Sequence, residues 1–297
     1  MSDSPLWEAP ASPADGSQQG PAGIAPKLSL LATVREAYAI WFANFPRSLA
    51  LMAVPAGILL VQSVVVPPTQ PREQNDAIFS FDLADFAFAL LFFVAEIAFA
   101  TAWHKLVLER EARSAGRLSL GQAEWIYFKK LVMLFFIILL TGLAWVLAMS
   151  SLTSLGLGMG GLVGGDEGFN AAGIAVLAIG IAAAVYVAYR YGAFFLVLPA
   201  AAVGRNFLLR EATHRIGPNR WTLLMTYVCA YLPILLLDIL RSRIPLDLSG
   251  STTGFLLPFI GNLPELIFMP VIVGVLSITY RELVQRPEQA ALPHVFS

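Results

Sequence analysis

The sequence predicts an all-α, polytopic membrane protein with six transmembrane helices. These would form three helical hairpins, preceded by interfacial helices on the cytoplasmic side. Of the 297 residues, 57% are hydrophobic and only 13% are charged, whereas an average soluble domain has about 25% charged residues. Six apolar stretches are long enough to cross a bilayer, and nearly all the positive charge lies in alternate connections between them.

Each apolar stretch suits one helical crossing, because a hydrocarbon core about 30 Å thick needs roughly 20 apolar residues in an α-helix. Lipid offers no hydrogen-bond partner to backbone amides, so the spans must be helical. A β-barrel would show alternating polarity, and the run 131–140 shows none. The predicted membrane domain covers residues 28–285, with spans at 48–66, 83–103, 131–149, 171–189, 222–240 and 255–280.

The distribution of basic residues predicts the orientation, because lysine and arginine stay on the cytoplasmic side of a membrane. Of the 19 lysines and arginines, only Arg72, Arg241 and Arg243 fall in connections that would face the other side. We therefore expect both termini in the cytoplasm. Arginine far outnumbers lysine, which suits a GC-rich bacterial genome.

The two ends of the chain are predicted to be cytoplasmic tails. Residues 1–27 are rich in Pro, Ala, Ser, Gly and Gln and lack a basic start followed by an apolar core. They are therefore expected to be a disordered tail rather than a signal peptide. Residues 286–297 form the second predicted tail.

The three odd-numbered spans are each preceded by an amphipathic stretch with aromatic residues and a basic residue just before the span. The even-numbered spans also end alike, in Trp103-His104, Tyr189-Arg190 and Tyr280-Arg281. One interpretation is an internal repeat of three units, each an interfacial helix, a span, an outer loop and a second span. The alternative is that any transmembrane helix end collects aromatic and basic anchors.

Three polar residues inside predicted spans form a candidate intramembrane site: Glu96, Asn262 and Glu265. A carboxylate in a membrane costs on the order of 2.5–3.5 kcal/mol and often has a functional role. The alternative is a protonated carboxyl hydrogen-bonded to a neighbouring span. Three prolines around Glu265, at positions 258, 264 and 270, predict a broken or kinked last span.

A second group of candidates consists of basic residues expected to contact anionic lipid headgroups on the cytoplasmic face. Each basic residue near such a surface contributes roughly 1 kcal/mol of attraction. The segment 194–203, just after Arg190, is expected to lie along the membrane interface. Separately, the glycine-rich segment 156–168 is expected to be a flexible outer loop. The candidate headgroup contacts are Arg190, Arg205, Arg210, Arg215, Arg220, Lys129 and Lys130.

The sequence offers no catalytic, cofactor-binding or metal-binding pattern. None of His104, His214 and His294 has a metal-ligand companion at helical spacing, and Cys229 is the single cysteine. Zinc-protease and nucleophile-elbow motifs are lacking. A net charge of −1 provides no field to attract nucleic acid. We therefore expect a non-enzymatic protein without a cofactor. Its expected partner is the lipid bilayer. Whether it also binds another protein or a second copy of itself is left open by the sequence.

Several short motifs resemble a recurring bacterial layout. They are Val34-Arg35-Glu36-Ala37-Tyr38 with Asn44, Arg190, Leu198-Pro199-Ala200, Glu211 to Gly217, Asn219, Trp221, and Tyr280-Arg281-Glu282-Leu283. Together they make residues 28–285 similar to the YciC-like inner-membrane proteins and to the membrane domain fused to some glycerophosphodiester phosphodiesterases. The resemblance implies a six-span inner-membrane protein with no established chemistry of its own. The phosphodiesterase activity belongs to a separate soluble domain, and no segment here is long and polar enough to be one.

Three functional hypotheses follow. The first is a protein that organises lipid or partner proteins in the bacterial envelope. The second is a transporter or channel for a small solute or ion, which requires Glu96 and Glu265 to share one cavity. The third is a membrane-embedded lipid-modifying enzyme, which requires polar side chains that converge near one membrane surface.

Overall fold

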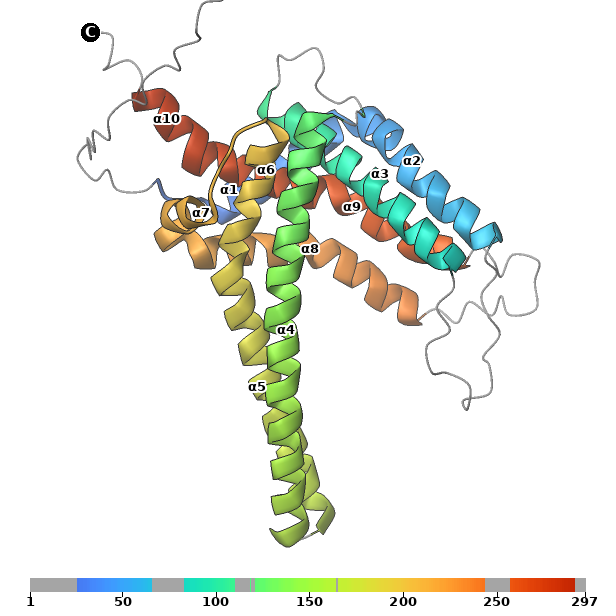
Figure 1. The fold of residues 1–297 in the computed structure, drawn as a ribbon, viewed down its shortest axis with the longest axis vertical. Coiled ribbons are helices and arrows are strands. Elements are labelled where there is room, and N and C mark those ends of the chain that lie inside the picture. The colour runs from blue at the N-terminus through green and yellow to red at the C-terminus, as the bar shows by residue number, and fades with distance from the viewer. Residues whose placement is uncertain are drawn as a thin grey trace, which may run out of the picture.

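The computed structural model describes residues 26–65, 83–109, 118, 121–163, 165–243 and 257–291. These residues form helices and short connections, with no β-strand among them (Figure 1). Within this part of the chain, six helices are long and apolar enough to cross a membrane. The all-α, polytopic fold class is therefore confirmed. The candidate spans are Phe45–Val65, Leu83–Leu108, Gln122–Trp145, Ala178–Ala202, Leu209–Leu240 and Phe259–Gln289.

The first hairpin consists of α2 and α3, and a shorter helix, α1, precedes it. Only Asn44 separates α1 from α2, and its side-chain amide donates to the carbonyl of Ile40 at 2.9 Å. The Tyr38 hydroxyl donates to the carbonyl of Ala230 on α8 at 3.1 Å, and α1 also packs on α9. The first predicted interfacial segment is thus a helix built into the bundle. The bounds are α1 (Leu30–Ala43), α2 (Phe45–Val65) and α3 (Leu83–Leu108).

The second hairpin consists of α4 (Gln122–Val163) and α5 (Gly165–Tyr191), which pack against each other. Its 42-residue first helix is about 63 Å long at 1.5 Å per residue. That is about twice the thickness of a hydrocarbon core. Figure 1 shows this hairpin projecting away from the other helices.

Two expectations for the second hairpin were wrong. The amphipathic segment before the third span is no separate helix, because it forms the first turns of α4. The glycine-rich stretch 156–168 is helical on both sides of residue 164 rather than a loop. The physical reason is that α4 and α5 pack against each other, and such tertiary packing outweighs the low intrinsic helix propensity of glycine.

After α5 the chain turns through a short 3-10 helix, η1 (Gly192–Leu196), into α6 (Val197–Ala202). All six residues of α6 are buried, as are Ala193 and Leu196 of η1. The prediction that 194–203 lies along the membrane interface was therefore wrong. A segment made almost wholly of apolar residues is more stable packed against α3 and α4 than at a polar boundary.

The third hairpin consists of α8 and α9. Gly217 begins the 3-10 turn before α8 with φ +30°, a backbone conformation that favours glycine. The expectation of a broken last span was wrong, since α9 runs without interruption through Pro264 and Pro270. Neighbouring helices make such prolines tolerable in membrane helices. The bounds are α7 (Leu209–Ile216), η2 (Gly217–Asn219), α8 (Arg220–Arg243), α9 (Leu257–Tyr280), the π-helix η4 (Arg281–Gln285) and α10 (Arg286–Ala291).

One end of the bundle gathers most of the ion pairs, and we call it the basic end. There α3, α5 and α9 end while α4 and α8 begin. Lys105 on α3 pairs with Glu124 on α4 at 2.8 Å, and Arg281 contacts both carboxylate oxygens of Glu36 at 2.8 Å. The Glu36–Arg281 pair joins the segments 34–38 and 280–283, which are the first and last motifs of the family resemblance. The two paired residues are 245 positions apart in the sequence.

Close helix packing also occurs toward the basic end, where α1, α3 and α9 meet at Gly274. A Cβ atom placed on Gly274 would lie 3.6 Å from Trp103 Nε1 and 3.7 Å from the Cβ of Ala37. The fully buried Phe99 and Trp103 stack with ring centroids 6.2 Å apart. The small residues at 37 and 274 therefore let three helices approach closely.

The predicted tails extend beyond what the structure describes. Residues 1–25 and 292–297 lie outside the described residues. Within the described part, Pro26 and Leu28 are hydrogen-bonded to Asn219, and Arg286–Ala291 forms α10. The internal repeat stays a prediction, although α2 and α8 each contain one internal proline, Pro55 and Pro233.

Candidate functional site

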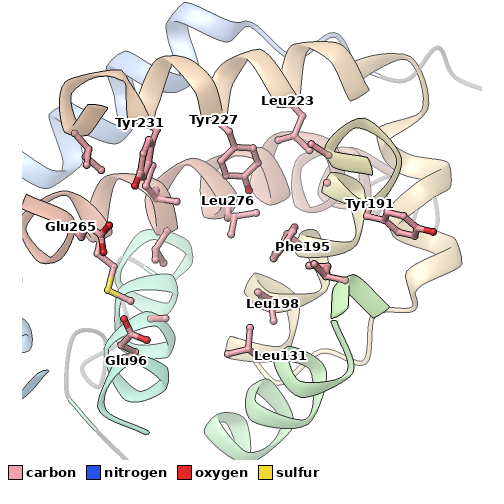
Figure 2. Close-up of a pocket in the computed structure, with 18 of the residues that line it drawn as sticks. Glu96, Leu131, Tyr191, Phe195, Leu198, Leu223, Tyr227, Tyr231, Glu265 and Leu276 are labelled. Atoms are coloured by element: carbon pink, nitrogen blue, oxygen red, sulfur yellow. The ribbon is translucent and has the colours of Figure 1, made fainter. Parts of the chain in front are cut away.

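A cavity of about 1000 Å³ lies between the α4–α5 hairpin and the helices α3, α8 and α9. Its wall runs along α8 from Arg220 to Ile234, about 21 Å by helix rise. Figure 2 shows the side chains that face it. Most of the wall is aliphatic or aromatic, as is usual for a small-molecule site. Examples are Phe93, Leu131 and Leu223.

All three residues of the candidate intramembrane site line this cavity. Glu96 comes from the middle of α3, while Asn262 and Glu265 come from α9, three residues apart and hence on one face of that helix. The polarity of these residues could be recognised from the sequence. Their common cavity depends on how α3 packs against α9, which the sequence does not reveal.

The two glutamates lie at the same end of the cavity, Glu96 on α3 and Glu265 on α9 (Figure 2). Glu96 and Glu265 are close enough to interact electrostatically. Among the residues that the structure describes, neither carboxyl has a hydrogen-bond or ion-pair partner. The alternative interpretation, a carboxyl hydrogen-bonded to a neighbouring span, is therefore not what these helices show.

Five tyrosines line the cavity that the sequence did not single out as site residues. They are Tyr127 on α4, Tyr189 and Tyr191 at the end of α5, and Tyr227 and Tyr231 on α8. The hydroxyl of Tyr227 is buried and has no hydrogen-bond partner. The spacing of four residues between Tyr227 and Tyr231, which places both on one face of α8, was the available signal. It was missed because tyrosine is common in membrane helices as an interfacial anchor.

His104, beside the cavity wall, belongs to a buried hydrogen-bond chain. Ser277 donates its hydroxyl proton to the carbonyl of Val273 at 2.9 Å. A hydroxyl has one proton, so Ser277 Oγ accepts from His104 Nδ1, which lies 2.7 Å away. His104 Nε2 is then the acceptor, and the Tyr127 hydroxyl lies 3.5 Å from it.

This chain does not form a nucleophile–base pair. A catalytic serine would donate its proton to the histidine, whereas here the histidine donates to Ser277. His104 and Ser277 are both 0% exposed, so no substrate reaches them. The arrangement satisfies buried polar groups and joins α3, α4 and α9. It offers no support for a lipid-modifying enzyme at this position.

The predicted headgroup contacts fall into separate environments. Arg220 lines the basic end of the cavity, with its guanidinium 5.8 Å from the Tyr189 ring centroid. Lys129 lies over the ring of Trp125 at 5.1 Å, and Lys130 donates to the carbonyl of Phe207 at 3.4 Å.

Two of the predicted headgroup contacts have an acidic partner within the chain. Arg205 pairs with Glu288 of α10 at 2.6 Å, and Arg215 lies 3.7 Å from the same carboxylate. The hydrogen bond to Glu288 raises the pKa of Arg205 above its ordinary value. Arg190 and Arg210 are exposed. Headgroup binding stays a prediction for all of these residues.

Comparisons with protein-family models, with curated proteins and with solved structures find no match to this chain. The similarity to the YciC-like proteins therefore stays a prediction. In the described residues, no group of three or more His, Cys, Asp or Glu side chains could hold a metal ion. Any functional conclusion thus depends on the cavity and the groups that line it.

Proposed function

We propose that the protein binds a small solute in the intramembrane cavity and moves it across the bilayer, with Glu96 and Glu265 as its contact residues. One observation carries the proposal. Two carboxyls from different spans face one cavity without a partner among the described residues. Carboxyl groups at membrane depth are costly, and those that persist commonly line ion or substrate pathways.

The chemistry of the pair suits uptake and release. Negative charge without a counter-charge is unfavourable in an apolar site, so the pair of carboxyls is stable when it shares a proton or a bound cation. Binding a cation therefore displaces a proton, and release of the cation allows the proton to return. Such an exchange couples solute movement to the proton gradient without any covalent step.

Proteoliposomes with a pH-sensitive dye in the lumen test this proposal. Proton movement is followed after addition of potassium, choline or tetraphenylphosphonium under an imposed pH gradient. We expect at least one cation to drive proton flux that falls tenfold or more in Glu96→Gln and in Glu265→Gln. Glu109→Gln is the matched control, because it removes a carboxylate just beyond α3 and outside the cavity. Equal flux in all four proteins for all three cations would refute the proposal.

A second candidate function is the organisation of anionic lipid at the basic end. The observation that favours it is the exposure of Lys129, Arg190 and Arg210 there. Replacing all three by glutamine should reduce the anionic phospholipid that copurifies with the protein in nanodiscs made from mixed lipids. Unchanged lipid composition around the triple variant would exclude this function. Both candidates are non-enzymatic.

A further inference from the structure

We infer that the cavity takes a hydrophobic organic cation, whose positive charge lies between Glu96 and Glu265 and whose apolar body lies along the wall formed by α4 and α8. The inference rests on the proposed function, because it specifies the solute that the cavity binds. Charge, cavity size and the aromatic wall each support it.

The charge argument concerns what could neutralise the two carboxyls. The basic residue that lines the cavity is Arg220, at its other end. Tyr231, which is close enough to Glu265 for an electrostatic interaction, lies 11 residues from Arg220 on α8, about 16 Å by helix rise. Arg220 is therefore too far away to pair with Glu265. A cation supplied by the ligand would complete the site.

The size and polarity of the cavity favour an organic cation over a bare metal ion. A hard cation such as calcium takes six to eight oxygen ligands. The described part of the chain brings no third acidic, His or Cys side chain to Glu96 and Glu265. About 1000 Å³ is at the upper end of the range for sites of drug-sized ligands. Leu131, Leu223 and Leu276 supply the apolar surface for such a body.

The tyrosines add a feature that is specific for positive charge. Figure 2 places Tyr231 and Tyr227 on α8, on the cavity side, with Tyr231 nearer to Glu265. Aromatic rings attract cations through their electron-rich faces, and more strongly when the cation is desolvated. The Tyr227 hydroxyl itself is buried, so the ring of Tyr227, and not its hydroxyl, is the part that contributes to the cavity wall.

A lipid with an anionic headgroup at Arg220 is the competing occupant. Its acyl chain would then extend along the cavity toward Glu96 and Glu265. Apolar carbon against two carboxyls leaves both groups without a partner, which is unfavourable for polar groups away from water. The polar side chains at the end of the cavity lined by Glu96 and Glu265 therefore favour a cation over a hydrocarbon chain as the occupant.

Two probes of nearly the same shape and opposite charge, tetraphenylphosphonium and tetraphenylborate, provide the test. Saturable binding is measured on the full chain in nanodiscs of neutral lipid, with empty nanodiscs subtracted. We expect tetraphenylphosphonium to bind, and its affinity to fall at least tenfold in Glu96→Gln and in Glu265→Gln. Affinity should not change in Glu109→Gln. Arg220→Gln should raise the affinity, because it removes a positive charge from the lining of the cavity.

The result can be separated from the proposed function. If tetraphenylphosphonium binds through both carboxyls but drives no flux, the inference stands and transport fails. If potassium or choline drives carboxyl-dependent flux while tetraphenylphosphonium does not bind, transport stands and the inference is overturned. Binding of tetraphenylborate that Arg220→Gln weakens, with no carboxyl-dependent binding of the cation, also overturns it and favours the lipid. Circular dichroism and size-exclusion profiles of each variant exclude loss of fold as the cause.

Discussion

The buried side-chain amide of Asn219, in the turn before α8, forms two hydrogen bonds to the first described residues of the chain. Its Oδ1 accepts from the backbone N–H of Leu28 at 2.9 Å, and its Nδ2 donates to the carbonyl of Pro26 at 3.0 Å. Asn219 is 2% exposed and the Leu28 side chain is 4% exposed. We predict that Asn219→Ala releases residues 26–29 without unfolding the bundle.

The expected change in the free energy of this local opening follows from the two hydrogen bonds of Asn219. Each hydrogen bond contributes about 0.5–1.5 kcal/mol net, and leaving the buried Leu28 N–H without an acceptor raises its share to about 1–3 kcal/mol. The local opening equilibrium should therefore shift by about 3 kcal/mol. At 1.4 kcal/mol per factor of ten, this is about a 100-fold change.

Hydrogen–deuterium exchange of the protein in detergent measures this opening at the Leu28 amide. We expect exchange there to become about 100-fold faster in Asn219→Ala, while amides in α9 keep their protection. Asn44→Ala is the control, because Asn44 makes a local bond to the carbonyl of Ile40 within α1. Unchanged exchange at Leu28 would refute the reasoning, as would equal acceleration throughout the chain.

Three further predictions concern the packing of α1 and α9. Gly274→Ala should be tolerated because its new contacts of 3.6 and 3.7 Å are ordinary van der Waals distances, whereas Gly274→Leu should cost about 1–3 kcal/mol by overpacking; equal melting temperatures would contradict this. Reversing the pair as Glu36→Arg with Arg281→Glu should recover part of the loss caused by each single change. Because Glu36 is 36% exposed, we expect a coupling of about 1 kcal/mol, and a double-mutant cycle with no coupling would exclude it. Burial raises the pKa of Tyr38 above its ordinary value of 10. The protein should therefore lose stability as pH rises through the folded-state pKa, and this alkaline loss should be smaller in Tyr38→Phe in melts recorded from pH 8 to 11.

Several features could be predicted without a structure because they depend on local composition. The six spans followed from stretches of apolar residues, since helix formation in lipid requires only length and hydrophobicity. Glu96 and Glu265 were recognisable because a carboxyl in an apolar run is rare. The prolines of α9 misled the prediction, because their effect on a helix depends on neighbours that the sequence does not identify.

The remaining features depend on contacts between residues far apart in the chain. Glu36 meets Arg281, and Glu288 occupies Arg205, because η4 and α10 continue α9 beyond the expected end of the last span. The sequence shows which residues are basic, but it does not show which of them form ion pairs with acidic residues in the folded chain. For Arg205, the sequence therefore could not distinguish a contact with lipid from an ion pair within the protein.

The sequence by itself determined that the chain is a multi-pass helical membrane protein, because each span meets lipid largely as an independent apolar segment. Only the tertiary structure decided that Glu96, Glu265 and Tyr227 line one cavity and that His104 is sealed beside it. The physical reason is that burial and pairing are set by how helices pack on each other, and packing joins residues that no local pattern connects.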